Sequence, residues 1–304
     1  VCRWWVATLA FESDIKADIE FFKTAGEAYR KVRNTLRFML SNLADFEPSP
    51  PGKDHSCGQG MCVPISAYEP EMLDTWALAE FDALSKAVRK AYAEYDFRAA
   101  TQKIYDFCSD TLSSVYLAAA KDRLYCDRPD SERRRRTQSA LWDITDGLCR
   151  LLAPLLPHTA DEAWRALRRL PNDSEETVHT RTFIEGFGAK PDAEAWGAFL
   201  KLRDQALVTL EEGRKADGGI ENPLDAGLTL PDPNGAISKL DPRDLADLLG
   251  VSRVTIDKGA KAPALIDLRG EPRCERSWKR DGTVRQRSDG GMLSDRDAEA
   301  VGVA

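Results

Sequence analysis

The 304 residues contain no apolar run close to the ~20 residues that a membrane-spanning helix requires, so a span of that kind is excluded. The opening segment has no initiator Met, no basic region and no cleavage site, so we expect that it is not a signal peptide and that the sequence is a segment from within a longer chain. Neither G-x-G-x-x-G after a strand nor G-x-x-x-x-G-K-[ST] occurs. Three histidines, none near a nucleophile at a motif position, give a hydrolytic triad no support. The chain shows no active site of its own.

The chain also has fewer basic than acidic residues, with 43 Lys and Arg against 50 Asp and Glu, which gives a net charge of −7. Long-range attraction to nucleic acid is therefore weak, and RNA could bind only through local basic patches. The length predicts about two domains, and 42% hydrophobic with 31% charged residues is typical of a folded globular chain. Seven cysteines are an odd number, and several fall in helical patterns, which predicts buried free thiols and a reducing, cytoplasmic compartment.

Helical periodicity dominates the first two-thirds of the chain, where apolar residues recur at three- and four-residue steps. We expect Ser131 to cap one of these helices, and Thr159 with Glu162 to form a capping box that starts another. Pro154 and Pro157 should stop or kink the chain. Five long helices in sequence predict an antiparallel helical bundle. The helices are expected over residues 18–43, 71–95, 97–125, 131–152 and 159–170.

The pattern changes after residue 175. One more long helix fits residues 193–215, and a short helix fits 242–249. Short β-like runs at 227–230, 252–257 and 264–268 are separated by turn residues, which predicts a small α/β appendage. The tail over 269–304 has almost no apolar periodicity, so we expect it to be weakly ordered by itself. The predicted fold class is mainly α.

A loop rich in Pro and Gly, residues 47–70, separates the first two predicted helices and carries His55, Cys57 and Cys62. An H-x-C-x4-C arrangement could hold a metal ion, but a fourth ligand is missing and the spacing matches no standard site. The alternative, a surface loop without metal, is the stronger expectation.

Basic clusters are the features that stand out. Arg30, Lys31, Arg33 and Arg37 lie within eight residues that contain Asn34 and no acidic residue, and they could grip phosphates. Equally, such a face could brace a neighbouring domain or pair with acidic helices. The run over 133–136 is four arginines, for which an RNA-facing role competes with a solvated helix face.

A third cluster, residues 269–287, holds seven basic and three acidic residues around Trp278. Cations beside an exposed aromatic ring can hold phosphates while a base stacks, as in single-stranded RNA recognition.

Particular blocks of the sequence resemble the isoleucyl-tRNA synthetases, which are class I aminoacyl-tRNA synthetases. Tyr29-Arg-Lys-Val-Arg-Asn-Thr-Leu-Arg-Phe-Met-Leu-Ser-Asn-Leu43 resembles the first helix of their anticodon domain. Arg3-Trp-Trp-Val-Ala-Thr8 is similar to the segment that follows their catalytic domain. Further similar blocks follow in order, at Tyr95–Arg98, Cys108–Asp110, Tyr116–Leu117, Lys121–Asp127 and Leu151–Trp164.

The resemblance implies the C-terminal, tRNA-binding part of an enzyme that joins isoleucine to tRNA(Ile) with ATP and Mg. It implies that residues 1–17 end the connection to the catalytic domain, 18–175 form the anticodon-binding domain, 176–268 a small α/β subdomain, and 269–304 a basic tail. His-Ile-Gly-His and Lys-Met-Ser-Lys-Ser do not occur, so we expect the chain alone, without the N-terminal catalytic and editing domains, to be inactive. We expect a cytoplasmic monomer.

The resemblance also implies a zinc module with two C-x-x-C pairs at the end of many bacterial members. The matching positions here are Cys274, Ser277, Ser294 and Asp297. Serine hydroxyls are poor zinc ligands, and one thiolate with one carboxylate does not complete a tetrahedral site. We therefore predict a degenerate zinc-ribbon-like tail that has lost its metal.

Our candidate tRNA-binding residues come from two clusters. Two other hypotheses remain, namely a stand-alone helical module that binds RNA or protein, and a fragment of a valine-specific relative. In the family that the sequence resembles, Arg33 and Asn34 could instead bridge to the catalytic domain. The candidates are Arg30, Arg33, Asn34 and Arg37 in the first helix, and Arg276, Trp278, Lys279 and Arg280 in the tail.

Overall fold

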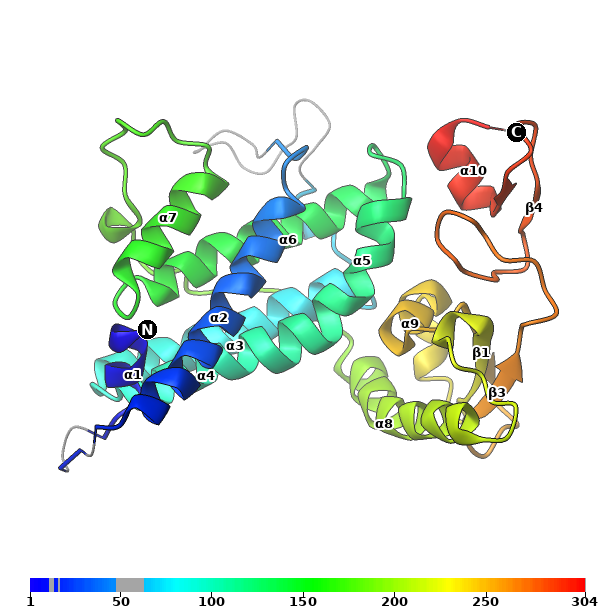
Figure 1. Ribbon diagram of the computed structural model, residues 1–304, viewed down its shortest axis with the longest axis horizontal. Coiled ribbons are helices and arrows are strands. Elements are labelled where there is room, and N and C mark those ends of the chain that lie inside the picture. The colour runs from blue at the N-terminus through cyan, green and yellow to red at the C-terminus, as the bar shows by residue number, and fades with distance from the viewer. Residues whose placement is uncertain (11–13, 16, 48–62, 304) are drawn as a thin grey trace. The chain divides into compact units, whose positions relative to one another are not determined.

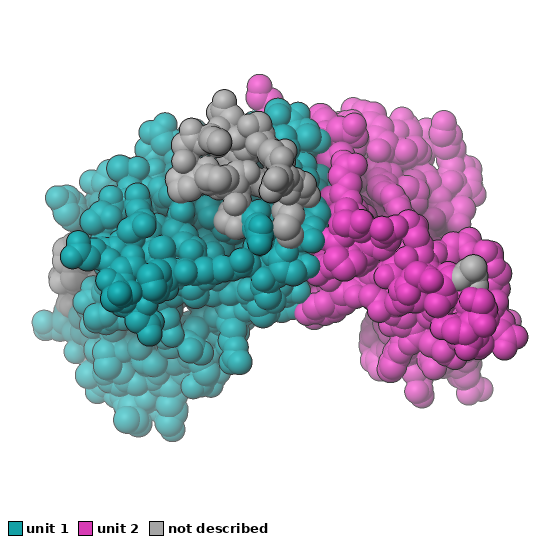
Figure 2. Space-filling model, turned by 90° about the horizontal axis from the view of Figure 1, so that it is seen from above, with its two compact units in different colours: residues 1–68, 77–115, 135–189 teal, residues 69–76, 116–134, 190–304 magenta. Residues whose placement is uncertain are grey.

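A computed structural model describes residues 1–10, 14–15, 17–47 and 63–303, and the chain divides into two compact units. Unit 1 comprises residues 1–68, 77–115 and 135–189, and unit 2 comprises 69–76, 116–134 and 190–304 (Figure 2). The structure is mainly helical, with two small sheets (Figure 1). Because the division follows spatial contacts rather than chain order, the domain boundaries at 17, 175 and 268 stay predictions. Of the helices in the described ranges, none is both long and apolar enough to cross a bilayer.

Unit 1 is built from helices. The predicted helices at 18–43, 71–95 and 131–152 are confirmed to within two residues at each end. The Asp18 side chain caps the first of them by accepting a hydrogen bond from the Glu20 amide at 3.1 Å. Ser131 likewise accepts one from the Arg134 amide at 3.3 Å. The elements are α1 (Cys2–Ala7), α2 (Ile19–Ser41), α4 (Phe97–Asp106), α7 (Pro157–Leu167), most of α3 (Leu73–Ala93) and α6 (Glu132–Leu152), and the 3-10 turns η1 (Ile65–Ala67) and η3 (Val178–Thr180).

The core of unit 1 comes mainly from the apolar faces of its helices, as the three- and four-residue spacing predicts, whereas α6 is buried along most of its residues. Its apolar side chains are buried to within a few per cent of full burial. They include Trp4, Val32, Leu36, Met39, Phe81, Val88, Ile104, Leu148 and Trp164.

Residues 97–126 are helical throughout, which confirms the helix expected over 97–125. Between α4 and α5 (Leu117–Cys126), however, the segment η2 (Phe107–Tyr116) is a π-helix. There the Ser113 and Ser114 hydroxyls donate to carbonyls five residues earlier, at 2.7 and 2.8 Å. Apolar spacing did not reveal this segment, because three- and four-residue steps continue through it and long π-helical runs are rare.

The start of α7 differs from the prediction. The helix begins at Pro157, and proline suits the first helical position because its missing N–H would have no partner there. The Thr159 hydroxyl instead lies 3.1 Å from the Tyr29 hydroxyl of α2, so it joins two helices. The capping box at Thr159 and Glu162 is therefore wrong.

Unit 2 contains α5, α8 (Ala193–Lys215) and a three-stranded sheet in the order β2 (Arg253–Asp257), β1 (Ala226–Pro231), β3 (Ala264–Asp267). Strand β1 pairs in parallel with β2, through the crossover helix α9 (Pro242–Leu249), and antiparallel with β3. Gly250 ends α9 at a φ of 71°, a conformation that favours glycine. The helices and strands predicted for this region are confirmed. Two 3-10 turns accompany them, η4 (Pro223–Asp225) and η5 (Ile237–Lys239).

The tail of unit 2 is folded around its own small core. Strands β4 (Arg285–Gln286) and β5 (Met292–Leu293) pair antiparallel, and α10 (Asp295–Val301) follows. The expectation of weak order is wrong because the few apolar residues, although too widely spaced to give a period, meet in space. The buried cluster is Cys274, Val284, Leu293 and Ala298, with Met292 and Val303 packed against it.

Buried ion pairs hold unit 2 together. Arg123 of α5 is 0% exposed, and its guanidinium lies 2.8 Å from Asp244 of α9 and 3.8 Å from Asp74. Arg133 is also nearly buried and reaches Asp244 at 2.9 Å. For Arg133, both interpretations of the arginine run, an RNA-facing or a solvated face, are therefore wrong. A buried guanidinium needs carboxylate partners, and these come from a helix more than 100 residues away in sequence.

A close contact between two helices of unit 1 gives a first prediction. A Cβ at Gly147 of α6 would overlap the buried ring of Phe81 of α3. Gly147→Ala should therefore lower the free energy of unfolding by about 1–3 kcal/mol, measured by urea denaturation. The control is Gly197→Ala in α8, where a Cβ meets nothing within 4 Å and alanine favours the helix. Equal effects of the two substitutions would contradict the tight packing at Gly147.

Candidate nucleic-acid interface

Four polar side chains on α2, Arg30, Arg33, Asn34 and Arg37, form what we call the α2 arginine face. All four are exposed, because the buried Val32 and Leu36 turn the opposite side of the helix inward. Arg30 forms an ion pair with Glu27 on the same helix. The other three make no hydrogen bond or ion pair within the described part of the chain. Their polar groups are thus available to a partner from outside.

Arg33 and Arg37, one helical turn apart, line a groove of about 240 Å³ between α2 and α7. Apolar side chains of both helices form its floor, and Glu162 is its acidic member. The hydrogen bond between Tyr29 and Thr159 fixes the two helices beside it. Two guanidinium groups that line one groove could each bind a phosphate of a nucleic-acid strand. The remaining lining residues are Leu36, Leu40, Thr159, Ala163 and Ala166.

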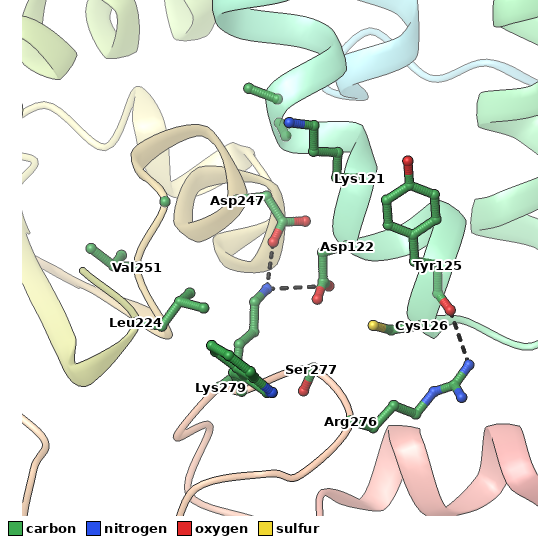
Figure 3. A pocket seen from close by; sticks show the side chains of 14 residues that line it. Lys121, Asp122, Tyr125, Cys126, Leu224, Asp247, Val251, Arg276, Ser277 and Lys279 are labelled. Atoms are coloured by element: carbon green, nitrogen blue, oxygen red, sulfur yellow. Dashed lines mark hydrogen bonds and ion pairs between the residues drawn. The ribbon is translucent and has the colours of Figure 1, made fainter. Parts of the chain in front are cut away.

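A second hollow lies in unit 2, and we call it the tail pocket (Figure 3). Its volume is about 390 Å³, and α5 forms one wall while the turn at 276–279 forms another. Figure 3 shows Lys279 reaching between the carboxylates of Asp247 and Asp122. The lining residues are Ala118, Ala119, Lys121, Asp122, Tyr125, Cys126, Leu224, Asp247, Gly250, Val251 and Arg276–Lys279.

The predicted basic residues of the tail have carboxylate or carbonyl partners inside unit 2. The Lys279 ammonium lies 2.5 Å from Asp247 and 3.2 Å from Asp122, and only 12% of the side chain is exposed. The Arg280 guanidinium lies 2.8 Å from Asp225. Arg276 donates to the carbonyl oxygen of Tyr125 at 2.9 Å. Much of the positive charge of this cluster is therefore compensated within the protein.

Trp278 is the exposed member of the same turn. Its side chain is 55% exposed, and its backbone has a φ of 64°, a rare conformation for a bulky residue. The Arg273 guanidinium lies 5.3 Å from the centre of its ring, within the range of a cation–π contact. An aromatic face beside a guanidinium offers a nucleic-acid base a surface to stack on. A positive φ held in a structured turn at an exposed tryptophan is the kind of backbone strain that accompanies binding sites.

Charge within the tail pocket changes the acidity of its lining groups. Burial alone would raise the pKa of the Asp122 carboxyl, but Lys279 and Arg296 outweigh burial and lower this pKa from 3.8 to about 2. Burial raises the pKa of the Cys126 thiol to about 11, so this cysteine is a poor nucleophile at neutral pH. The pocket therefore shows binding groups and no activated nucleophile among these residues.

The cysteines that the structure describes agree in part with the sequence. Cys108, Cys126, Cys149 and Cys274 are buried free thiols, as predicted, whereas Cys2 is exposed. Burial raises the pKa of Cys108 to about 12. The possible metal ligands His55, Cys57 and Cys62 lie outside the described residues.

The four positions predicted to have lost a metal, Cys274, Ser277, Ser294 and Asp297, do come together. Hydrogen bonds from the first three all end on Oδ2 of Asp297, at 3.0, 2.6 and 2.9 Å. Among the described residues, no group of three or more His, Cys, Asp or Glu side chains could hold a metal ion.

Sequence reasoning missed the α5 wall of the tail pocket. In the sequence, Lys121, Asp122 and Tyr125 belong only to a block of family resemblance, and Asp247 belongs to a short predicted helix. Nothing in their local spacing places them beside residue 279. The sequence does show a basic tail and acidic residues in the segments of α5 and α9. This complementary charge indicates that the segments could pair, but it does not say which residues meet.

Comparison with known proteins gives one domain and a set of relatives. Residues 74–222 match the family described as the anticodon-binding domain of tRNA ligase. The isoleucine–tRNA ligase of Brevibacillus brevis is 35% identical over 89% of this chain and 28% of its own length. That of Desulfotalea psychrophila is 34% identical over 93% of the chain and 31% of its own length. The isoleucine–tRNA ligase of Bacillus cereus is 32% identical over 99% of this chain and 33% of its own length. The chain thus spans about a third of the length of these relatives.

The Asp122 ion pairs predict a pH dependence of stability. Because its pKa is lower in the folded chain, Asp122 stabilises the fold above about pH 4, and this contribution is lost as the pH falls towards 2. Asp122→Asn should cost about 2 kcal/mol of unfolding free energy at pH 6 and progressively less below pH 4. Urea denaturation at a series of pH values measures the difference.

The control for this series is Asp173→Asn, which removes an exposed carboxylate from unit 1 and matches the change in net charge. A loss in Asp122→Asn that is the same at pH 3 and pH 6 would contradict an ionised Asp122 in the folded chain.

Proposed function

We propose that the chain belongs to the tRNA ligases that carry this anticodon-binding domain, and that it is the part of an isoleucine–tRNA ligase that binds the anticodon arm of tRNA(Ile). The parent enzyme would attach isoleucine to this tRNA with ATP and Mg. The present chain carries neither catalytic signature of class I synthetases, so by itself it binds and does not aminoacylate. Its protein partner is the catalytic domain of the same enzyme.

The observation that carries this proposal is the match of residues 74–222 to an anticodon-binding domain, within a chain similar to isoleucine–tRNA ligases over 89–99% of its length. The helical fold supports it, and we propose that residues 18–175 act as the anticodon-binding bundle. We further propose a cytoplasmic monomer with a tail derived from a zinc ribbon. A valine-specific relative is the weaker alternative, since the ligases compared here are isoleucine enzymes.

The chemistry of the α2 arginine face favours phosphate binding. Arg33 and Arg37 have exposed guanidinium groups and no partner within the described part of the chain, so no internal ion pair must break before a phosphate binds. Asn34 between them offers an amide that can donate to a phosphate oxygen or to a base edge. Arg30 can exchange Glu27 for a phosphate at small cost, because its ion pair lies on an exposed helix surface.

The tail would contribute base stacking rather than phosphate contacts alone. Trp278 presents an exposed ring with Arg273 against it, and this pair suits an unpaired base of a loop. Arg276, Lys279 and Arg280 hold the turn through their internal partners. Both contacts can occur in an acidic chain, because each is local.

Binding of tRNA(Ile) tests the phosphate contacts. Arg33→Ala with Arg37→Ala should weaken binding about tenfold at physiological salt and reduce the slope of log K against log salt by about 1–2. The matched control is Lys258→Ala with Lys261→Ala, which removes two positive charges between β2 and β3. If both double variants lose the same affinity, the effect is one of net charge and the α2 arginine face is not the binding site.

Base recognition is tested by Trp278→Ala and by a tRNA with a different anticodon. Loss of one stacking contact should weaken tRNA(Ile) binding about 5- to 100-fold with little change in the salt slope. Equal affinity for both tRNAs at every salt concentration would refute anticodon recognition. Equal loss on both tRNAs in the variant would assign Trp278 to a base outside the anticodon.

A further inference from the structure

The tail contains a buried polar cluster with one carboxylate at its centre. Oδ2 of Asp297 accepts hydrogen bonds from the Cys274 thiol at 3.0 Å, the Ser277 hydroxyl at 2.6 Å and the Ser294 hydroxyl at 2.9 Å. Asp297 and Cys274 are 0% exposed and Ser294 is 1% exposed. Two donors from the turn at 274–277 and one from the cap of α10 therefore meet at a single buried oxygen atom.

These are the four positions at which the family resemblance implies zinc ligands, so the fit of a metal can be judged from the donor set. Zinc in structural sites is held by four thiolates or imidazoles, and here the set is one thiol, two hydroxyls and one carboxylate. Neutral hydroxyls cannot balance the charge of a divalent ion. The residues do not fit zinc.

The local backbone shows why the positions still converge. The turn that carries Cys274 and Ser277 is closed by two backbone hydrogen bonds at 2.9 Å, from the Trp278 amide to the Cys274 carbonyl and from the Cys274 amide to the Lys279 carbonyl. Ser294 caps α10 by accepting a hydrogen bond from the Asp297 amide at 3.2 Å. The capped helix therefore directs the Asp297 carboxylate towards the turn.

The negative charge of Asp297 is balanced by neighbouring guanidinium groups. Nε of Arg276 lies 3.6 Å from its Oδ1, and Nη2 of Arg296 lies 3.3 Å from the same oxygen. A carboxylate beside two guanidinium groups is the strongest hydrogen-bond acceptor in the cluster.

From this geometry we infer that the carboxylate of Asp297 has taken the structural place of the metal ion. It joins the turn at 274–279 to the start of α10 through the hydrogen bonds from Cys274 and Ser277, while the bond from Ser294 lies within the cap of α10, and it needs no ion to do so. The four side-chain positions nevertheless retain the convergence of a metal cage. This inference concerns the folding of the tail and does not depend on tRNA binding.

Metal analysis of the purified chain is the first test. After expression in zinc-supplemented medium, the chain should hold less than about one tenth of an equivalent of zinc, and EDTA should leave its melting temperature unchanged. About one equivalent of zinc that is lost in Cys274→Ala would overturn the inference.

Restoring the ligands is the second test. The variant Ser277→Cys, Ser294→Cys, Asp297→Cys together with the native Cys274 should bind about one equivalent of zinc, and Co²⁺ should give the absorption of tetrahedral thiolate coordination. The matched control places alanine at the same three positions and should bind none. If the folded cysteine variant binds no more metal than the alanine control, the positions do not form a cage. Near-UV circular dichroism checks that the variant is folded.

Neutralising the Asp297 carboxylate is the third test, and this test does not depend on metal binding. Asp297→Asn should speed hydrogen exchange at the amides of Cys274, Trp278 and Ala298 at least tenfold, because a neutral amide oxygen accepts the same bonds less strongly. The control is Glu275→Gln, an exposed carboxylate in the same turn. Unchanged exchange in Asp297→Asn would show that the carboxylate does not hold the tail together.

Discussion

The carboxylate of Asp247 is the point on which unit 2 depends. Arg133 lies 2.7 Å from it, Arg123 lies 3.7 Å from it, and Lys279 reaches it at 2.5 Å. Three cations from two different parts of the chain therefore share one side chain of α9. Removing one member of such a buried network leaves an uncompensated charge, which is more costly than the loss of any single pair at the surface. The network places α5 and the tail against α9 and so forms the walls of the tail pocket.

The internal pairing of basic side chains reduces the number of residues that are candidates for RNA binding. An acidic chain of net charge −7 engages many of its arginines and lysines internally, so a basic run in the sequence is weak evidence of a nucleic-acid surface. Arg133 and Lys279 illustrate this. Each lies in a basic segment that suggests a solvent-exposed side chain, and each is nearly buried in the fold. Arg33 and Arg37 differ, since both are exposed and neither has a partner within the described residues. The unpaired cations, not the most basic segments, are the stronger candidates.

The sequence predicted what depends on neighbours a few residues away. The helices at 193–215 and 242–249 have the predicted bounds because caps and apolar spacing act within a few turns. Prediction from the sequence failed where the structure depends on contacts between two elements. The spacing of apolar residues carries no information on the hydroxyl bonds of η2, and Pro157 outweighed the capping signal at Thr159. For the candidate site, residue type was enough to nominate Trp278 and the α2 arginines, which stay predictions, whereas the α5 wall required the fold.

The Asp297 cluster and Trp278 are linked through the turn at 274–279. The turn at 274–279 holds Trp278 at a positive φ, which costs energy and persists only if both ends of the turn are fixed. One end is fixed through Cys274 and Ser277 to Asp297, and the other through Lys279 to Asp247. A metal ion would fix the first end equally well, so its replacement by a carboxylate leaves the presentation of the ring unchanged. The presentation of the ring then depends on the position of the turn and not on the chemistry that holds it.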